Sequence, residues 1–191
     1  DIVATVCGGI LILPILAIVA VLIYLDSPGP IVFGHKRVGQ GGKEFPCYKF
    51  RSMVPNAQEA LEVYLKENPA AREEWERDFK LKDDPRVTRI GKFLRKTSLD
   101  ELPQLFNVVK GDISLVGPRA LVPHELSAYD KKHVLLAVKS GLTGLAVVSG
   151  RRSISFEERR RIDLYYVQNW SLWLDITILL KTCLVIFQKD N

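Results

Sequence analysis

Two adjacent carboxylates, Asp100 and Glu101, lie in the segment SLDELPQLF and are the first candidates for chemistry. Neighbouring residues of a helix point about 100° apart, so the two acids do not share one proton as a facing pair would. They can take separate roles, such as attack on phosphorus and binding of Mg²⁺. Ser98 followed three residues later by Glu101 is also typical of a helix-capping box, which would make the acids structural. The spacing alone leaves both interpretations open.

Basic side chains flank this pair in the sequence. They are Lys49, Arg51, Arg86, Arg89, Lys92, Arg95, Lys96 and Arg119. Such a cluster favours an anionic membrane surface or a substrate rich in phosphate. Arg119 follows Gly117 and Pro118, and a rigid turn of this kind suits a two-pronged contact with phosphate. Together the acids and cations indicate a protein that handles phosphate groups.

Residues 2–25 contain no charged side chain, which indicates a membrane segment. As one helix they would be about 36 Å long, against a hydrocarbon core of ~30 Å. Pro14 lies in the middle, so the segment either crosses once with a kink or breaks there and returns to the same face. Four basic residues follow and place that side in the cytoplasm: His35, Lys36, Arg37 and Lys43.

The rest of the chain has to position these groups. Ser27–Pro30 is a turn, and the glycines within residues 39–42 lie between two short segments that are typical of a β-hairpin. The strongly charged stretch 56–82 predicts a solvated excursion in which Pro69 splits two helices. A helix that starts near Ser98 should end at Gly111. The pattern predicts several helices and one β-hairpin.

Three segments of the final third complete the expected fold. Residues 140–151 predict a short strand and turn, and residues 156–170 a basic helix. Residues 171–189 are apolar but carry Asp175 and Lys181, which favours an amphipathic helix that lies at a membrane interface.

Composition excludes several classes of protein. The 191 residues give room for one ordinary domain, and 47% hydrophobic with 26% charged residues excludes a disordered chain. Three widely spaced cysteines form neither a disulfide framework nor a zinc site. A formal net charge of +5 is modest, and the basic stretch 86–96, in which Phe93 is the single aromatic residue, has no aromatic platform, so nucleic-acid binding is disfavoured.

Four stretches resemble the bacterial sugar transferase family, the monotopic phosphoglycosyl transferases. They are KRVGQGGKEFPCYKFRSM, DPRVTRIGKFLRKTSLDELPQLFNVVKGDISLVGPR, GLTGLAVVSGR and YYVQNWSLWLDITILLKT. Members of this family move a sugar-1-phosphate from a UDP-sugar onto polyprenyl phosphate. The charged excursion resembles that of longer members, the undecaprenyl-phosphate galactose or glucose phosphotransferases, whose catalytic part is the C-terminal region of a larger membrane protein.

The resemblance implies roles for individual residues. Asp100 would be the nucleophile that attacks the β-phosphate and releases UMP. It would also be one of the ligands of a Mg²⁺ ion. Glu101 would assist, paired with Arg95. Arg119 would bind phosphate. The remaining expected substrate-binding residues are Lys49, Arg51, Thr143 and Arg151.

The resemblance also implies a place in the cell. Residues 1–26 would form a re-entrant helix broken at Pro14. Residues 27–191 would form a mainly helical α+β catalytic domain with a β-hairpin, on the cytoplasmic face of the bacterial inner membrane. Expected partners are a UDP-sugar, polyprenyl phosphate and membrane lipid, with no nucleic acid, and a homodimer is left open. The alternative is a non-catalytic, membrane-anchored basic scaffold that binds anionic lipid or a protein partner.

Overall fold

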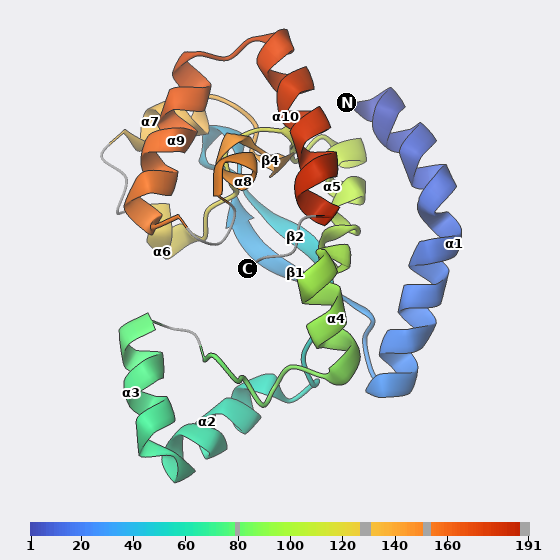
Figure 1. Ribbon diagram of the computed structural model, residues 1–191, viewed down its shortest axis with the longest axis vertical. Coiled ribbons are helices and arrows are strands. Elements are labelled where there is room, and N and C mark those ends of the chain that lie inside the picture. The colour runs from blue at the N-terminus through green and yellow to red at the C-terminus, as the bar shows by residue number, and fades with distance from the viewer. Residues whose placement is uncertain (79–80, 127–130, 151–153, 188–191) are drawn as a thin grey trace. The chain divides into compact units, whose positions relative to one another are not determined.

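A computed structural model describes the chain except for residues 79–80, 127–130, 151–153 and 188–191 (Figure 1). Its elements in chain order are α1 (Ile2–Asp26), β1 (Val32–Val38), η1 (Gln40–Gly42), β2 (Glu44–Phe50), α2 (Ala57–Glu67), α3 (Pro69–Asp78), α4 (Arg89–Thr97), η2 (Leu99–Glu101), α5 (Gln104–Lys110), β3 (Ser114–Val116), α6 (Pro123–Leu126), α7 (Lys132–Leu136), β4 (Gly141–Thr143), α8 (Leu145–Gly150), α9 (Phe156–Gln168) and α10 (Leu172–Phe187). The fold is mainly helical with short strands, which confirms the predicted α+β class.

The chain divides into two compact units. The first unit comprises Asp1–Leu13, Gly34–Lys49 and Pro103–Asn191. The second unit comprises Pro14–Phe33 and Phe50–Leu102. Each unit has its own buried core, so each can position functional groups independently.

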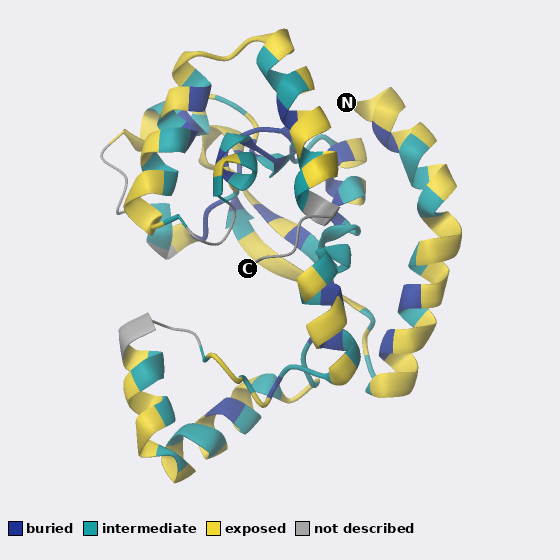
Figure 2. Ribbon diagram, in the orientation of Figure 1, coloured by how far each residue is buried: buried dark blue, intermediate teal, exposed yellow. Residues whose placement is uncertain are grey.

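Helix α1 is the one helix among the described residues that is long and apolar enough to cross a membrane. Most of its side chains are exposed and apolar, and Leu11 and Leu25 are 79% and 73% exposed (Figure 2). The helix is continuous through Pro14, so the expected break in the backbone is not observed. A helix interior can accommodate a proline by giving up one backbone hydrogen bond. The re-entrant topology stays a prediction.

The core of the second unit joins the C-terminal half of α1 to α4. Val19 and Ile23 of α1 pack with Phe50 and with Leu94, which is 1% exposed. The Asp26 carboxylate at the end of α1 accepts a hydrogen bond of 3.1 Å from the backbone N–H of Ile90 in the first turn of α4. An apolar cluster and a polar cap therefore hold the two helices together.

Gly91 allows a second close contact in the same unit. A Cβ at this position would collide with the backbone carbonyl of Ser52, so α4 lies directly on that part of the chain. The Thr88 hydroxyl caps α4 by accepting a hydrogen bond of 2.9 Å from the Gly91 N–H. Only a glycine permits this approach without displacing the helix.

The predicted helix start at Ser98 is wrong. Ser98 has a φ of 56° and is the C-terminal cap of α4, and its side chain makes no capping hydrogen bond to η2. A helix that began at Ser98 would place Pro103 in its interior, where the ring clashes with the carbonyl of Leu99 and the N–H is missing. Helix α5 instead begins at Gln104, after Pro103.

The charged excursion forms α2 and α3, and Pro69 is the first residue of α3. This confirms the two predicted helices, because proline is well tolerated at the first helical position. The ring of Trp75 in α3 lies 5.0 Å from the guanidinium carbon of Arg86. That cation–π contact fastens the excursion within the second unit.

The predicted β-hairpin is confirmed as the pair β1 and β2. Gly41 and Gly42 in its turn have φ values of 69° and 80°, which favour glycine. Asn107 is fully buried in the first unit and holds β2. Its amide nitrogen donates to the Pro46 carbonyl at 2.8 Å, and its amide oxygen accepts from the Tyr48 N–H at 3.0 Å.

A small parallel sheet of β3 and β4 lies at the centre of the first unit. Ser114 pairs with Gly141, and Val116 pairs with Thr143. A Cβ at Gly141 would collide with the backbone N–H of Gly117, so only glycine permits this approach. The strand predicted within residues 140–151 is therefore confirmed, but α8 follows it where a turn was expected.

Helices α9 and α10 complete the first unit. Ser155 and Glu158 form a capping box at the start of α9, the basic helix expected from the sequence. Ile178 of α10 is 1% exposed and packs with Tyr166 and Val116. Other positions of α10 are exposed (Figure 2), and Trp173 is among the exposed large apolar residues. One face of α10 is thus core, and its interfacial role stays a prediction.

Candidate active site

The two candidate carboxylates lie on the 3₁₀ turn η2, between α4 and α5. The Glu101 N–H donates to the Ser98 carbonyl and the Leu102 N–H donates to the Leu99 carbonyl, both at 3.2 Å. A 3₁₀ turn has about three residues per turn, so the side chains of Asp100 and Glu101 leave it in different directions. This geometry fits two separate roles better than one shared proton.

Leu99 and Leu102 hold this turn in place. Both pack against the buried cluster that contains Val19 and Ile23 of α1. Asp100 and Glu101, which lie between the two leucines, are half-buried. The carboxylates are therefore flanked by two leucines that join the same apolar cluster as the C-terminal half of α1.

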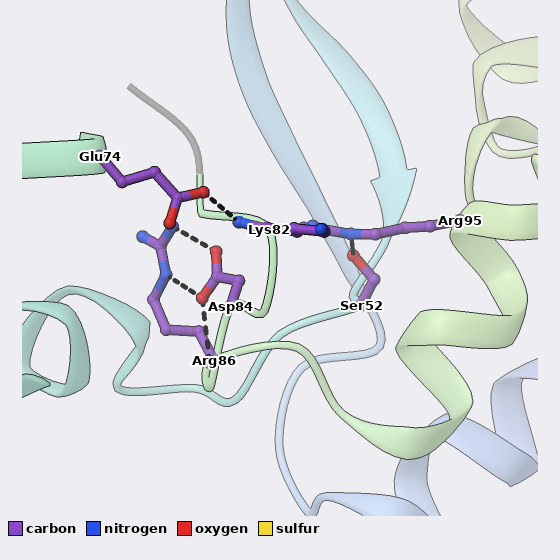
Figure 3. Close-up of polar contacts among 6 residues, drawn as sticks. All are labelled: Ser52, Glu74, Lys82, Asp84, Arg86 and Arg95. Carbon is purple, nitrogen blue, oxygen red and sulfur yellow. Dashed lines mark hydrogen bonds and ion pairs between the residues drawn. The ribbon is translucent and has the colours of Figure 1, made fainter. Parts of the chain in front are cut away.

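Arg95 lies in the last turn of α4, five residues before Asp100. Its Nε donates a hydrogen bond of 2.8 Å to the hydroxyl of Ser52, which is 5% exposed (Figure 3). Sequence reasoning missed this serine. This hydrogen bond to a buried hydroxyl fixes the orientation of the Arg95 side chain within the second unit.

Asp84 and Arg86 form a second fixed group in the same unit (Figure 3). The Arg86 side chain donates to the two Asp84 carboxylate oxygens at 2.8 and 2.6 Å. Burial alone would raise the pKa of Asp84, but hydrogen bonds from the Arg86 side chain and backbone, with the charges of Arg86 and Arg95, lower it. The charge of Arg86 is therefore paired with the Asp84 carboxylate, which gives Arg86 a structural role.

Arg119 occupies the turn after β3 in the first unit, and its side chain is 42% exposed. Its Nη2 lies 3.7 Å from Glu125 Oε1, and Arg37 reaches the same carboxylate at 3.8 Å. Arg37 also donates to the Ala120 carbonyl at 3.1 Å. The turn therefore presents the partly exposed guanidinium of Arg119. The hydrogen bond from Arg37 to the Ala120 carbonyl fixes the backbone next to it.

The surroundings of this turn are positively charged. Burial, then the charges of Arg37 and Lys49, hold the pKa of His35 below its ordinary value. Lys49 is a half-buried residue of β2. A group of cations around a partly exposed arginine is suited to binding a phosphate.

Asp163 is a functional candidate that sequence reasoning missed. It lies on α9 with 2% of its surface exposed, and its carboxylate accepts a hydrogen bond from the backbone N–H of Arg119. Burial raises its pKa to about 7, against the opposing charges of Arg159 and Arg119. Helical spacing of Asp163 with Tyr166 and Val167 was the available signal, because it places the acid on the buried face of α9.

The remaining expected site residues differ in their settings. Thr143 is 8% exposed, and its hydroxyl lies 2.7 Å from that of Thr182 in α10, so it joins β4 to that helix. Arg51 is buried in the second unit, and its Nη2 donates to the Ser27 carbonyl. Arg151 lies outside the described residues.

The expected site residues are thus distributed between the units. Arg51, Arg95, Asp100 and Glu101 belong to the second unit, and Lys49, Arg119 and Thr143 belong to the first.

A magnesium ion fits the carboxylates in one binding mode. Within the described residues, no group of three or more His, Cys, Asp or Glu side chains could form a cage for a metal. Mg²⁺ is usually held by one or two carboxylates together with water and substrate phosphates. Asp100 can supply the one carboxylate that this binding mode requires.

Comparison with known proteins decides the family. The model of the family described as bacterial sugar transferase matches residues 1–189. The chain belongs to the bacterial sugar transferase family. This membership confirms the resemblance seen in the sequence, and it covers the hairpin, both carboxylates and the Arg119 turn.

Three relatives of this sugar transferase chain have informative names. An undecaprenyl-phosphate galactose phosphotransferase of Salmonella typhimurium is 58% identical over 164 residues, which cover 85% of this chain and 34% of the relative. A UDP-galactose-lipid carrier transferase of Erwinia amylovora is 54% identical over 95% of this chain and 38% of its own length. An exopolysaccharide production protein, ExoY, of Sinorhizobium fredii is 45% identical, with 95% of this chain and 81% of the relative covered.

The chain therefore spans about a third of the first two relatives and most of the third. The match to the third relative shows that the features of this sugar transferase chain occur in proteins only slightly longer than itself.

Proposed function

We propose that this protein transfers a hexose-1-phosphate from a UDP-sugar to polyprenyl phosphate and releases UMP. The proposal includes a place at the cytoplasmic face of the bacterial inner membrane, where the product starts the assembly of a surface polysaccharide. Family membership and the names of the relatives, two of which refer to galactose, support this substrate class.

The observation that carries the proposal is the attachment of the carboxylates to the apolar helix. Leu99 and Leu102 flank Asp100 and Glu101 and pack against the buried cluster to which Val19 and Ile23 of α1 belong. If α1 lies in the bilayer, this packing holds the carboxylates close to the depth of lipid headgroups. A phosphate carried by a lipid lies at that depth, so the acceptor does not have to leave the membrane.

The proposed chemistry has two steps with one nucleophile. A carboxylate oxygen of Asp100 attacks the β-phosphorus of the UDP-sugar, and the bond from that phosphorus to the bridging oxygen breaks. The bridging oxygen leaves with UMP, and the sugar phosphate remains on Asp100 as an acyl phosphate. An oxygen of polyprenyl phosphate then attacks the same phosphorus, which forms the lipid diphosphosugar and restores the carboxylate.

Other side chains of the protein support these steps in the proposal. Glu101, directed differently from Asp100 by the 3₁₀ turn, orients the reacting groups. Arg95 keeps a positive charge in the unit that contains the nucleophile, and the exposed guanidinium of Arg119 binds a phosphate. When bound through Asp100 and substrate phosphates, Mg²⁺ would supply positive charge that offsets the diphosphate.

The test is release of UMP from a panel of UDP-sugars, measured with and without polyprenyl phosphate and Mg²⁺. We expect one UDP-hexose to give turnover, and Asp100→Asn to abolish turnover while the protein still binds membranes. Glu157→Gln, at an exposed position of α9, is the matched control and should keep full activity. Membrane binding without UMP release from any sugar nucleotide would instead favour the non-catalytic scaffold.

A further inference from the structure

The second unit buries a cation that has too few partners. Arg51 is 8% exposed, and its Nη2 donates to the Ser27 carbonyl. Its Nε and Nη1 are buried and have no hydrogen-bond partner among the described residues. Arginine keeps its proton in proteins, so this guanidinium cannot become neutral to escape the cost of burial. A buried charge without an anion is unfavourable by itself.

Arg86 shows what a satisfied arginine looks like in the same unit. It is 9% exposed, almost as buried as Arg51. Both oxygens of Asp84 accept hydrogen bonds from it, and Trp75 stacks on its guanidinium. Among the described residues, a carboxylate pairs with Arg86 and only a backbone carbonyl accepts from the Arg51 side chain. The missing anion at Arg51 is therefore a specific feature of that position.

The turn that follows α1 covers Arg51. Gly29 has a φ of 137°, and a Cβ there would collide with Arg51 Nη1. The Arg51 backbone N–H donates to the Ile31 carbonyl at 2.8 Å, which holds the turn against the β2 end. The backbone of the Ser27–Pro30 turn therefore lies directly against the Arg51 guanidinium. It begins directly after α1, so in a bilayer it lies near the headgroups.

We propose that Arg51 binds the phosphate of the lipid acceptor, polyprenyl phosphate, and that the Ser27–Pro30 turn moves aside to admit it. The inference rests on the proposed function and names the acceptor subsite within it. A phosphate would give the unpaired nitrogens the anion that the protein does not supply. Arg51 and Asp100 belong to the same unit, as an acceptor that attacks the Asp100-bound phosphorus requires.

The two half-reactions of the proposed mechanism separate donor from acceptor binding. The full chain in neutral detergent is mixed with UDP-sugar alone, and the first-turnover burst of UMP is measured by rapid quench. Polyprenyl phosphate is then varied to obtain its KM. The variants are Arg51→Gln and, as a control that removes an exposed cation of α2, Lys66→Gln.

We expect Arg51→Gln to leave the UMP burst within about 2-fold of wild type and to raise the KM for polyprenyl phosphate about 10- to 100-fold, the usual effect of losing a hydrogen bond to a charged group. Lys66→Gln should change neither value. A weaker burst or a higher KM for UDP-sugar would overturn the proposal, because Arg51 would then serve the donor. Unchanged kinetics with reduced binding to vesicles of phosphatidylglycerol would overturn it in favour of ordinary phospholipid.

A second variant and a second measurement guard against misfolding. Arg51→Lys keeps the charge but loses the planar fork, so a rise in acceptor KM of about 3- to 30-fold is expected. In the wild-type protein, polyprenyl phosphate should increase hydrogen exchange of the peptide that contains Ser27–Ile31, whereas UDP-sugar should not. Unchanged exchange with saturating acceptor would overturn the proposal. If the wild-type protein gives no UMP burst, the covalent intermediate of the proposed function is contradicted. The effect of Arg51→Gln on the steady-state KM for polyprenyl phosphate then still tests the acceptor subsite.

Discussion

Asp163 should make the stability of the folded protein depend on pH. Burial raises its pKa from 3.8 to about 7, so the folded state holds this proton more tightly than the unfolded chain does. The stabilising contribution is therefore complete below pH 3.8 and is lost as the pH rises through about 7. At ~1.4 kcal/mol per pKa unit, the difference between the unfolded and folded pKa values corresponds to about 4 kcal/mol of unfolding free energy.

Asp163→Asn tests this reasoning, because the amide cannot ionise but keeps an oxygen that can accept the Arg119 N–H. Urea unfolding in detergent, followed between about pH 4 and pH 8, gives the free energy for wild type and variant. We expect the difference, variant minus wild type, to rise by about 4 kcal/mol across this range. Other titrating groups cancel in the difference. Parallel curves for Asp163→Asn and wild type would refute a raised pKa.

Three further changes test the packing that positions the site. Asn107→Ala should lower the unfolding free energy by about 3 kcal/mol in urea titrations, because it leaves buried backbone groups unpaired; a loss below about 1 kcal/mol would contradict that role. Gly91→Ala should cost ~2 kcal/mol or more and reduce UMP release, since its Cβ collides with the Ser52 carbonyl, and a fully active, equally stable variant would count against this contact. Ser155→Ala should lower the unfolding free energy by about 1 kcal/mol without changing kcat, because Ser155 only caps α9. A large loss of activity would contradict this purely structural role.

Local patterns were enough to predict much of the fold. Glycines with positive φ mark the hairpin turn, Pro69 marks the start of α3, and Gly111 ends α5 with a φ of 80°. The uncharged run at the N-terminus predicted an apolar membrane segment with either a kink or a break at Pro14, and α1 is an apolar helix that continues through Pro14. In each case a residue type determines the backbone through its own sterics or solvation, so no distant contact was needed.

Features that depend on distant contacts could not be predicted. Ser98 has the sequence of a helix start, but it is left-handed and ends α4, while Leu99 and Leu102 pack against the core of the second unit. Strands of three residues, such as β3 and β4, are too short to show a period of two.

In the candidate site too, some features follow from local residue types and others from distant contacts. Asp100 and Glu101 stand out in the sequence, and the structure places them on one turn. The burial of Asp163 under Arg119, and of Arg51 under Gly29, arises where separate segments meet. A sequence pattern records the residue types at such places but not the partners that burial gives or denies them.

The central claim is that Asp100 forms a bond to phosphorus. The most direct measurement is intact and peptide mass spectrometry of the protein, quenched in acid after exposure to UDP-sugar and Mg²⁺ without any lipid acceptor. We predict the added mass of a hexose phosphate on the peptide that contains Asp100, equimolar release of UMP, and neither in Asp100→Asn. An unmodified peptide, together with UMP that appears only when polyprenyl phosphate is also present, would contradict the account.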